Sequence, residues 1–156
     1  MANETTIKAR TLWRVDATLE YMRGRMQGTL AEHVGIELIE MGEDYLVGTM
    51  PVDHRTCQPM RMLHGGASVV LAETLGSLAA NAANNDTTRR YVGQEINANH
   101  LRPVPEGSKV TAVARPIHIG KSSQVWSIEI KNARGQPTCI SRLTMAAVAA
   151  PPETDS

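Results

Sequence analysis

Hydrophobic and polar residues follow two different periods along the chain. Residues 11–32 have an apolar side chain at every third or fourth position, a spacing that predicts an amphipathic helix. Gly24 and Gly28 weaken its second half, because glycine disfavours the interior of a helix. Residues 65–84 show the strongest helical pattern, and the Asn-Asn-Asp run over 84–86 ends it.

Six other segments have the length and composition of strands, and the last four alternate with a period of two. They are residues 35–41, 45–52, 91–102, 108–118, 123–132 and 137–148. The resulting order predicts an α+β fold in which one long helix faces a mainly antiparallel sheet. Because such a sheet is covered on one face only, we expect an oligomer to bury its other face and its edges.

The long helix has three distinct faces. A leucine-rich stripe is predicted to pack on the sheet, and it comprises Leu71, Leu75, Leu78 and Ala82. Beside it runs a stripe of small residues, which suits either a closely approaching dimer partner or a well-packed core. This stripe comprises Ala72, Gly76, Ala79 and Ala83.

The third face carries the chemistry. Glu73 and Ser77 lie one turn apart, and Glu73 is the only ionisable residue of the helix before Asp86. The helix begins at His64-Gly65-Gly66, where unpaired N–H groups can stabilise the oxyanion that forms when a carbonyl is attacked. Glu73, two turns further on, is placed to attack or to activate a water. The alternative is an ordinary solvated helix face and a structural histidine.

Composition narrows the class of protein. The 156 residues fit a single domain over 1–156, with a helical segment at 1–34 and a flexible tail at 149–156. Sixteen basic and sixteen acidic residues argue against a general nucleic-acid binder. We find no signal peptide and no membrane-spanning stretch, so we expect a cytoplasmic protein. Two distant cysteines suggest free thiols, and the histidines do not predict a metal site.

Several runs of the sequence, taken together, resemble the hotdog-fold acyl-CoA thioesterases. These runs are residues 50–59, 63–77, 92–103, 118–120 and 124–126. The resemblance is greatest to the branch of the Arthrobacter-type 4-hydroxybenzoyl-CoA thioesterase. That branch also holds the proofreading thioesterase of enterobactin synthesis and the 1,4-dihydroxy-2-naphthoyl-CoA thioesterase. The resemblance extends over roughly two-thirds of the chain, from Tyr45 to Val148.

The resemblance implies a long helix wrapped by an antiparallel sheet, in dimers that build a homotetramer and share active sites at the subunit interface. Glu73 matches the family's catalytic carboxylate, a nucleophile or general base. Gly65 matches the residue whose N–H polarises the thioester carbonyl, and Gln58 and His64 match residues that orient the thioester and the leaving thiolate. Ser77 matches the position that holds the hydrolytic water. No cofactor is implied.

Coenzyme A needs cations for its phosphates. The candidates are Arg102, at the end of a strand, and a turn that resembles the family's nucleotide-contacting loop and contains Lys121, Ser122 and Ser123. The loop beside the expected acyl pocket departs from the family, because Met60 and Arg61 replace a Phe and a Gly that relatives commonly have. With Met62 next to them, these residues leave the acyl preference open.

The predicted function is hydrolysis of an acyl-CoA, with an aryl or other medium-sized acyl group, to free acid and CoA. Alternatives are hydrolysis of acyl carrier protein thioesters and a non-catalytic acyl-CoA-binding role. A hydratase of the same fold is disfavoured, because it needs a histidine paired with an acid.

Overall fold

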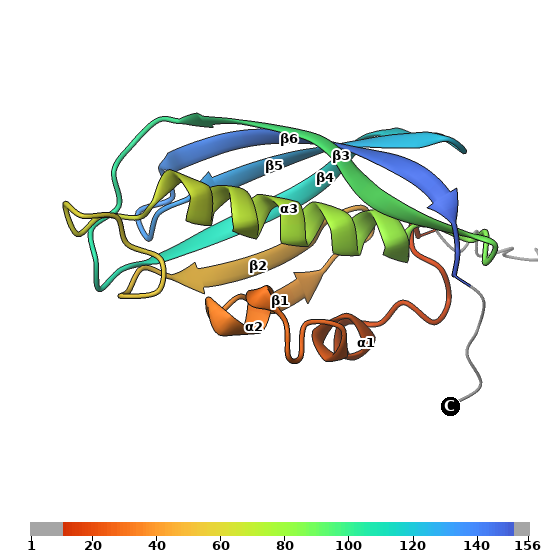
Figure 1. Cartoon of the computed structure of the whole chain (residues 1–156), viewed down its shortest axis with the longest axis horizontal. Helices are drawn as coiled ribbons and strands as arrows, with labels where there is room; N and C mark the ends of the chain where they lie inside the picture. The colour runs from red at the N-terminus through yellow and green to blue at the C-terminus, as the bar shows by residue number, and fades with distance from the viewer. Residues whose placement is uncertain (1–10, 152–156) are drawn as a thin grey trace, which may run out of the picture.

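The computed structural model describes residues 11–151, which form a six-stranded antiparallel sheet wrapped around one long helix (Figure 1). The strand order is β1-β2-β4-β5-β6-β3. The strands are β1 (Glu37–Met41), β2 (Leu46–Pro51), β3 (Arg89–His100), β4 (Lys109–Ile119), β5 (Ser123–Lys131) and β6 (Pro137–Ala149). The helices are α1 (Leu19–Gly24), α2 (Leu30–His33) and α3 (Gly65–Ala82). All six predicted strands and the long helix are therefore confirmed.

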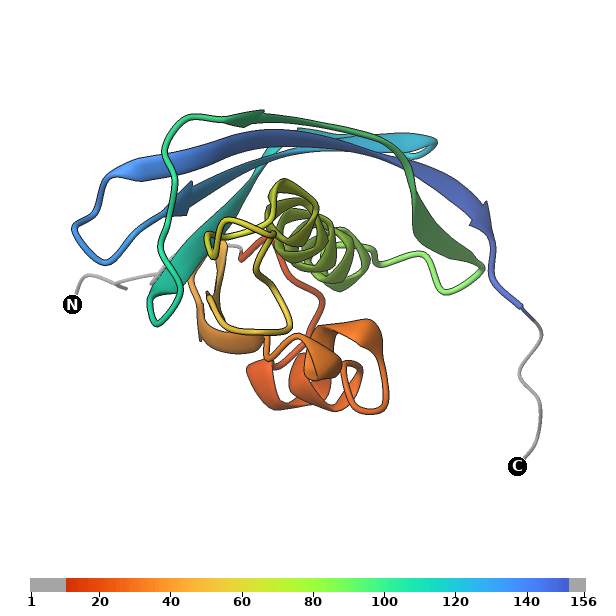
Figure 2. The same cartoon turned by 60° about the vertical axis from the view of Figure 1, so that its left-hand side comes forward.

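The helix α3 lies in the concave face of the curved sheet (Figure 2). Its leucine stripe packs as predicted at Leu71, Leu75 and Ala82, whereas Leu78 is only partly buried. The small stripe also faces the core of its own chain, because a Cβ on Gly76 would lie 2.5 Å from Leu143 Cδ2. Small side chains thus let the helix sink into the sheet.

The predicted helix over residues 11–32 is wrong as a continuous element, because α1 and α2 are two short helices. Helix α1 begins only after Thr18, whose side chain accepts a hydrogen bond from Tyr21 N, and it ends at Gly24. Gly28 then adopts φ 68°, a left-handed conformation that glycine tolerates and a helix interior does not. Both helices cover the side of α3 that faces away from the sheet (Figures 1 and 2).

Two tryptophans fasten the N-terminal segment to the core. The rings of Trp13 and Trp126 stack with centroids 6.2 Å apart, and Trp13 Nε1 donates to the Gly42 carbonyl at 2.6 Å. Buried Gln124 accepts from Trp126 Nε1 and donates to the Ala80 carbonyl of α3. These scarce aromatic residues therefore join the segment before α1, the sheet and the long helix.

An ion pair organises the loop that leads into α3. Asp53 accepts hydrogen bonds from the guanidinium and from the main-chain N–H of Arg55. These bonds lower the pKa of Asp53 to about 2, so its carboxylate stays ionised at neutral pH. Arg55 also donates to the His33 carbonyl at 3.0 Å. The loop that contains Gln58 is thereby tied to the end of α2.

Only the first residues of the tail expected over 149–156 lie within the described chain. Strand β6 continues to Ala149, and Ala150 N donates to the Thr88 carbonyl at 2.8 Å. The rest of the expected tail, residues 152–156, lies outside the described residues, as do residues 1–10 of the N-terminal segment. Within residues 11–151, no helix is long and apolar enough to cross a membrane.

Asn81 joins α3 to the start of β3. Its Oδ1 accepts from Tyr91 N at 3.0 Å, and its Nδ2 donates to the carbonyls of Tyr91 and Ser77 at 2.9 and 3.0 Å. One amide therefore satisfies three main-chain groups, and it sets where β3 begins to pass over the helix.

We expect Asn81→Ala to lower the free energy of unfolding by about 2–3 kcal/mol, because it leaves main-chain groups beneath β3 without partners. Urea denaturation measures the loss. Exposed Asn99→Ala, on the same strand, is the matched control and should cost less than about 0.5 kcal/mol. Equal stability of the two variants would contradict this role of Asn81.

Candidate active site

The N-terminus of α3 opens into a hollow of about 360 Å³, called here the Gln58 hollow. Gln58 and Gly65 line it, as do Met62, His100 and Arg102. Among the hydrogen bonds of residues 11–151, none is donated by the Gly65 N–H. This group is therefore available to a ligand at the positive end of the helix dipole.

His64 caps the helix. Its Nδ1 accepts a hydrogen bond from Gly66 N at 2.8 Å, so in the neutral ring the proton is on Nε2. The imidazole is exposed, and Nε2 can donate to an incoming group. The structural and the chemical interpretations of His64 are therefore compatible.

A side chain from the sheet lies close to the Cα of Gly65. A Cβ at this position would lie 2.8 Å from Nε2 of His100, which comes from the end of β3. His100 was not among the predicted site residues. The sheet places it, at the end of β3, beside the start of α3, where it lines the Gln58 hollow.

Glu73 and Ser77 line a second hollow of about 320 Å³, called here the Glu73 hollow. Its other walls come from the segment of α1 and α2, including Arg25, Thr29 and Leu30. Both Glu73 and Ser77 are half-buried, and Ser77 Oγ lies 3.8 Å from Met145 Sδ. The helix face carrying Glu73 is thus covered in part, rather than being an ordinary solvated face.

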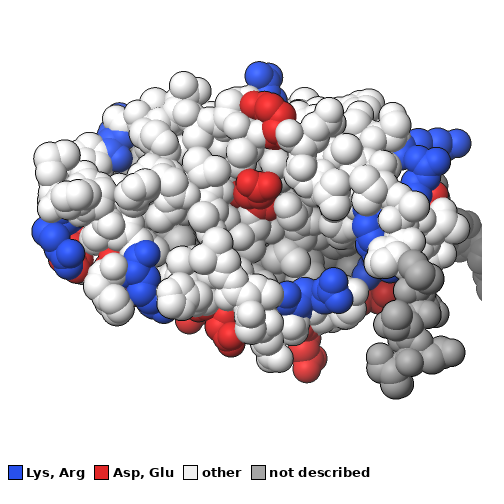
Figure 3. Space-filling model, in the orientation of Figure 1, with Lys and Arg blue, Asp and Glu red and all other residues white. Residues whose placement is uncertain are grey.

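Charged side chains are sparse on this side of the molecule (Figure 3). Over α3 and β3 the surface is largely uncharged and is interrupted by acidic groups, whereas Lys and Arg lie mainly towards its rim.

Gly93 of β3 lies directly over Glu73. A Cβ on Gly93 would overlap Glu73 Oε1, so the strand passes close above the carboxylate and a larger residue here would displace it. The register of β3 against β6 also shifts just after Gly93. A glycine inside a strand of period two was the available sequence signal for this close approach.

The two hollows are separate within one chain. Gly65 and Glu73 are eight residues apart on α3, which corresponds to about 12 Å along the helix axis. No residue lines both hollows. The Gly65 N–H and the Glu73 carboxylate of the same chain therefore cannot contact one carbonyl group.

The structure separates the two methionines of the preceding loop. Met62 lines the Gln58 hollow, but Met60 is 73% exposed and does not line it. Between them, Arg61 has φ 59° and its guanidinium pairs with Glu106. Arg61 is therefore neutralised within the chain.

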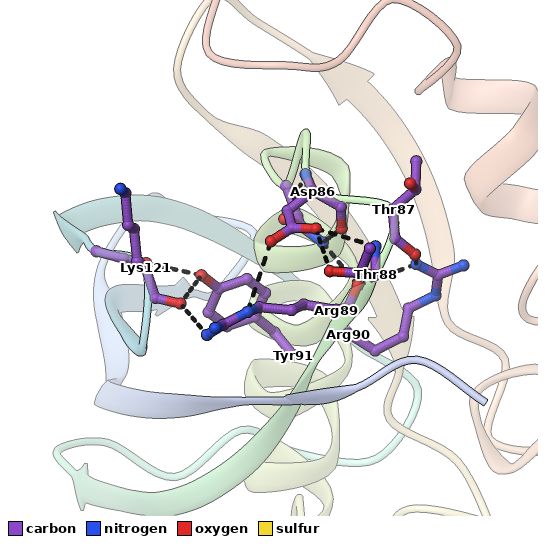
Figure 4. A network of polar contacts seen from close by, with 9 residues as sticks. Asp86, Thr87, Thr88, Arg89, Arg90, Tyr91 and Lys121 are labelled. Atoms are coloured by element: carbon purple, nitrogen blue, oxygen red, sulfur yellow. Dashed lines mark hydrogen bonds and ion pairs between the residues drawn. The ribbon is translucent and has the colours of Figure 1, made fainter. Parts of the chain in front are cut away.

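The turn at Lys121 lies at the opposite end of α3, beside a hollow of about 470 Å³ that Arg89 and Asp86 also line. Tyr91 Oη donates to the Gly120 carbonyl at 2.7 Å, and Arg89 donates to the Lys121 carbonyl at 3.3 Å (Figure 4). The Lys121 ammonium extends away from this network.

Main-chain groups of the same turn are paired with the sheet. The carbonyl of Ser123 accepts from Gly120 N, and that of Ser122 accepts from Ala147 N, each at 2.9 Å. The predicted phosphate-binding residues thus form two groups, Arg102 at one end of α3 and the Lys121 turn at the other.

Neither cysteine takes part in these hollows. Both are free thiols, and burial raises the pKa of Cys139. Within residues 11–151 there is also no group of three or more His, Cys, Asp or Glu side chains placed to hold a metal ion.

Comparison with known proteins identifies the family. The sequence profile of the thioesterase superfamily matches residues 60–139, about half of the chain. The chain belongs to this superfamily, and it is a thioesterase with the hotdog fold.

Individual relatives support this family assignment. The chain is 47% identical over 135 residues to the proofreading thioesterase EntH of Cronobacter turicensis, covering 86% of this chain and 97% of that one. It is 45% identical over 135 residues to the 1,4-dihydroxy-2-naphthoyl-CoA hydrolase of Escherichia coli, with 86% and 98% covered. A solved thioesterase of Haemophilus influenzae superposes with a TM-score of 0.84 at 47% identity, covering 89% and 96%.

We expect Gly93→Ala to reduce kcat for thioester hydrolysis by about 10- to 100-fold, because the new methyl group displaces the Glu73 carboxylate. The free energy of unfolding should change by less than about 1 kcal/mol, because only the end of a flexible side chain has to move. Gly24→Ala is the matched control, since a Cβ there meets nothing within 4 Å. Unchanged kcat in Gly93→Ala would show that the position of Glu73 does not matter.

Proposed function

We propose that this protein hydrolyses an acyl-CoA to free acid and CoA at a site built from two chains. One chain supplies Gln58, His64 and Gly65, and the other supplies Glu73 and Ser77. The observation that carries this proposal is the separation, within each chain, of the Gly65 N–H, which has no partner among residues 11–151, from the half-buried Glu73, whose position is about 12 Å further along the axis of α3.

The chemistry follows from these groups. The Gly65 N–H, at the positive end of α3, polarises the thioester carbonyl and stabilises the oxyanion. Glu73 either attacks this carbon, forming an anhydride that water then hydrolyses, or removes a proton from an attacking water that Ser77 holds. The C–S bond breaks, and His64 Nε2 donates a hydrogen bond to the leaving CoA thiolate. Gln58 orients the thioester.

Strand β3 offers the means of joining two chains. It is a long edge strand of 12 residues that pairs with β6, and no other strand within residues 11–151 pairs with its free edge. Val92 on this strand is 45% exposed. Antiparallel pairing of two β3 strands would bury the unpaired edge of each strand. It would also bring the Glu73 of one chain towards the Gly65 of the other. Two such dimers would form the proposed homotetramer.

Variants made in a relative support the assignment of Gln58 and Glu73. Two solved structures of a Staphylococcus aureus protein, 38% identical to this chain, carry alanine at a glutamine and at a glutamate fifteen positions apart. Gln58 and Glu73 have the same separation.

We assign CoA as the carrier and an aryl or other medium-sized group as the acyl moiety. A close relative is named for hydrolysis of an aryl-CoA, 1,4-dihydroxy-2-naphthoyl-CoA. The Glu73 hollow has apolar walls from Met26, Leu30 and Leu78, which suit the acyl group. Arg102 and the Lys121 turn, with Ser122 and Ser123, are the candidate contacts for CoA phosphates. We propose that the enzyme works in the cytoplasm, where acyl-CoA thioesters are found.

We expect Glu73→Gln to lower turnover at least about 100-fold, because it removes the nucleophile or base while keeping the shape of the side chain. Thiol release from benzoyl-, hydroxybenzoyl-, phenylacetyl- and aliphatic acyl-CoAs of several lengths measures it. Glu43→Gln, an exposed change in the β1–β2 turn, should leave turnover unaltered. Near-normal turnover in Glu73→Gln would remove this residue from its role, and hydrolysis of no acyl-CoA would reject the enzyme proposal.

A mixing experiment tests the shared site. Gln58→Ala and Glu73→Gln should each be nearly inactive, but a heterodimer of the two has one site with both residues intact. Joint refolding at equal amounts should restore about a quarter of wild-type activity, because half of the dimers are mixed and each mixed dimer has one intact site out of two. Activity no higher than that of the separate variants would place both residues of a working site on one chain.

A further inference from the structure

A further hollow lies beside the Gln58 hollow. It measures about 520 Å³ and is called here the Arg134 hollow. Its walls are the β3–β4 connection, with Arg102 and Ser108, and the β5–β6 hairpin, with Asn132 and Arg134. Both segments lie at the end of the molecule where α3 begins (Figures 1 and 2).

The Arg134 hollow adjoins the Gln58 hollow. Arg102 and Pro103 line both, so the two spaces meet across these residues. A molecule whose reacting carbonyl lies at Gly65 can therefore extend past Arg102 into the Arg134 hollow. The pantetheine arm of CoA separates the thioester from the phosphates, so a phosphate site has to lie beyond the carbonyl rather than at it.

The charge of these two hollows favours an anion. Neither is lined by Asp or Glu, and the Arg134 hollow has two arginines. Within residues 11–151, neither Arg102 nor Arg134 has a carboxylate within ion-pair distance. The nearby Glu106 is engaged by Arg61. The hollow at Lys121 differs, because Asp86 lines it and pairs with Arg89 at 3.5 Å.

Hydrogen bonds hold the Arg102 guanidinium and the turn that carries Arg134. Arg102 Nη1 donates to the Pro137 carbonyl at 2.7 Å, which directs its guanidinium towards the hairpin and leaves its other donors available. In the hairpin, Asn132 Oδ1 accepts from Arg134 N and Gln136 N, each at 3.0 Å. Arg134 is thus presented from a braced turn, and a planar guanidinium suits bidentate contact with phosphate.

From these observations we propose that Arg134, together with Arg102, binds phosphate groups of CoA in the Arg134 hollow. This assignment rests on the proposed function, and it adds a specific contact that distinguishes CoA thioesters from thioesters lacking nucleotide phosphates. Arg134 is a substrate-binding residue that takes no part in the bond-breaking step.

The test compares a CoA thioester with the pantetheine thioester of the same acyl group. In Arg134→Ala, KM for the CoA thioester should rise about tenfold, while kcat and the kinetics with the pantetheine thioester stay unchanged. Arg134→Lys should recover part of the loss, because it keeps the charge without the planar fork. Arg115→Ala is the matched control, since this exposed arginine pairs with Asp44 and lines neither hollow.

A binding measurement separates this proposal from the hydrolytic one. Titration calorimetry with CoA and with adenosine 3′,5′-bisphosphate needs no turnover, and both should bind Arg134→Ala more weakly than wild type by about tenfold, with a smaller difference in 1 M salt. If no thioester is hydrolysed but this difference is found, the phosphate site stands and the proposed reaction falls. If CoA thioesters are hydrolysed and Arg134→Ala changes neither KM nor binding, the phosphate site is overturned and the reaction stands.

Discussion

The close packing of α3 against the concave face of the sheet is the constraint on which the rest of the molecule depends. Gly76 and its small neighbours let Leu143 approach the helix axis, so the sheet can curve around α3 instead of resting on top of it. Because interiors pack at nearly crystalline density, this approach also determines the position of β3, the strand that pairs with β6 and lies over Glu73. The site is thus a consequence of how deeply the helix is buried.

Glycines at two further positions let strand β3 lie close to the candidate site residues of α3. Gly93 lets β3 pass above the Glu73 carboxylate, and Gly65 lets the end of the same strand, at His100, lie beside the start of the helix. Asn81 sets the beginning of β3 through three hydrogen bonds to the main chain. One strand and one helix, held together at three points, therefore define both halves of the proposed active site.

Because the Gly65 and Glu73 halves of the proposed site are separate within a chain, the β3 edge of the sheet can serve to bind a second chain. A long edge strand is a liability in a monomer, and an enzyme that needs a second chain to complete its site can use the same edge to recruit it. The charge distribution fits this arrangement, because the face over α3 and β3 is largely uncharged (Figure 3). Arg102 and Arg134, which have no carboxylate partner among the described residues, lie instead at the end of the molecule, where a substrate's phosphates can remain near solvent.

The sequence by itself determined the six strands, the long helix, its glycine-rich start and the face that carries Glu73 and Ser77. These depend on periodicities and turn residues that act over a few positions, whereas the family resemblance rests on short runs of particular residues such as 63–77. Only the tertiary structure decided that residues 11–32 form two short helices, that Gly93 lies over Glu73, and that Met62 but not Met60 faces the Gln58 hollow. It likewise brought Arg134 next to Arg102. Such neighbours come from segments far apart in the chain, and the curvature of the sheet and the closure of its loops set their positions, which no local pattern of residues encodes.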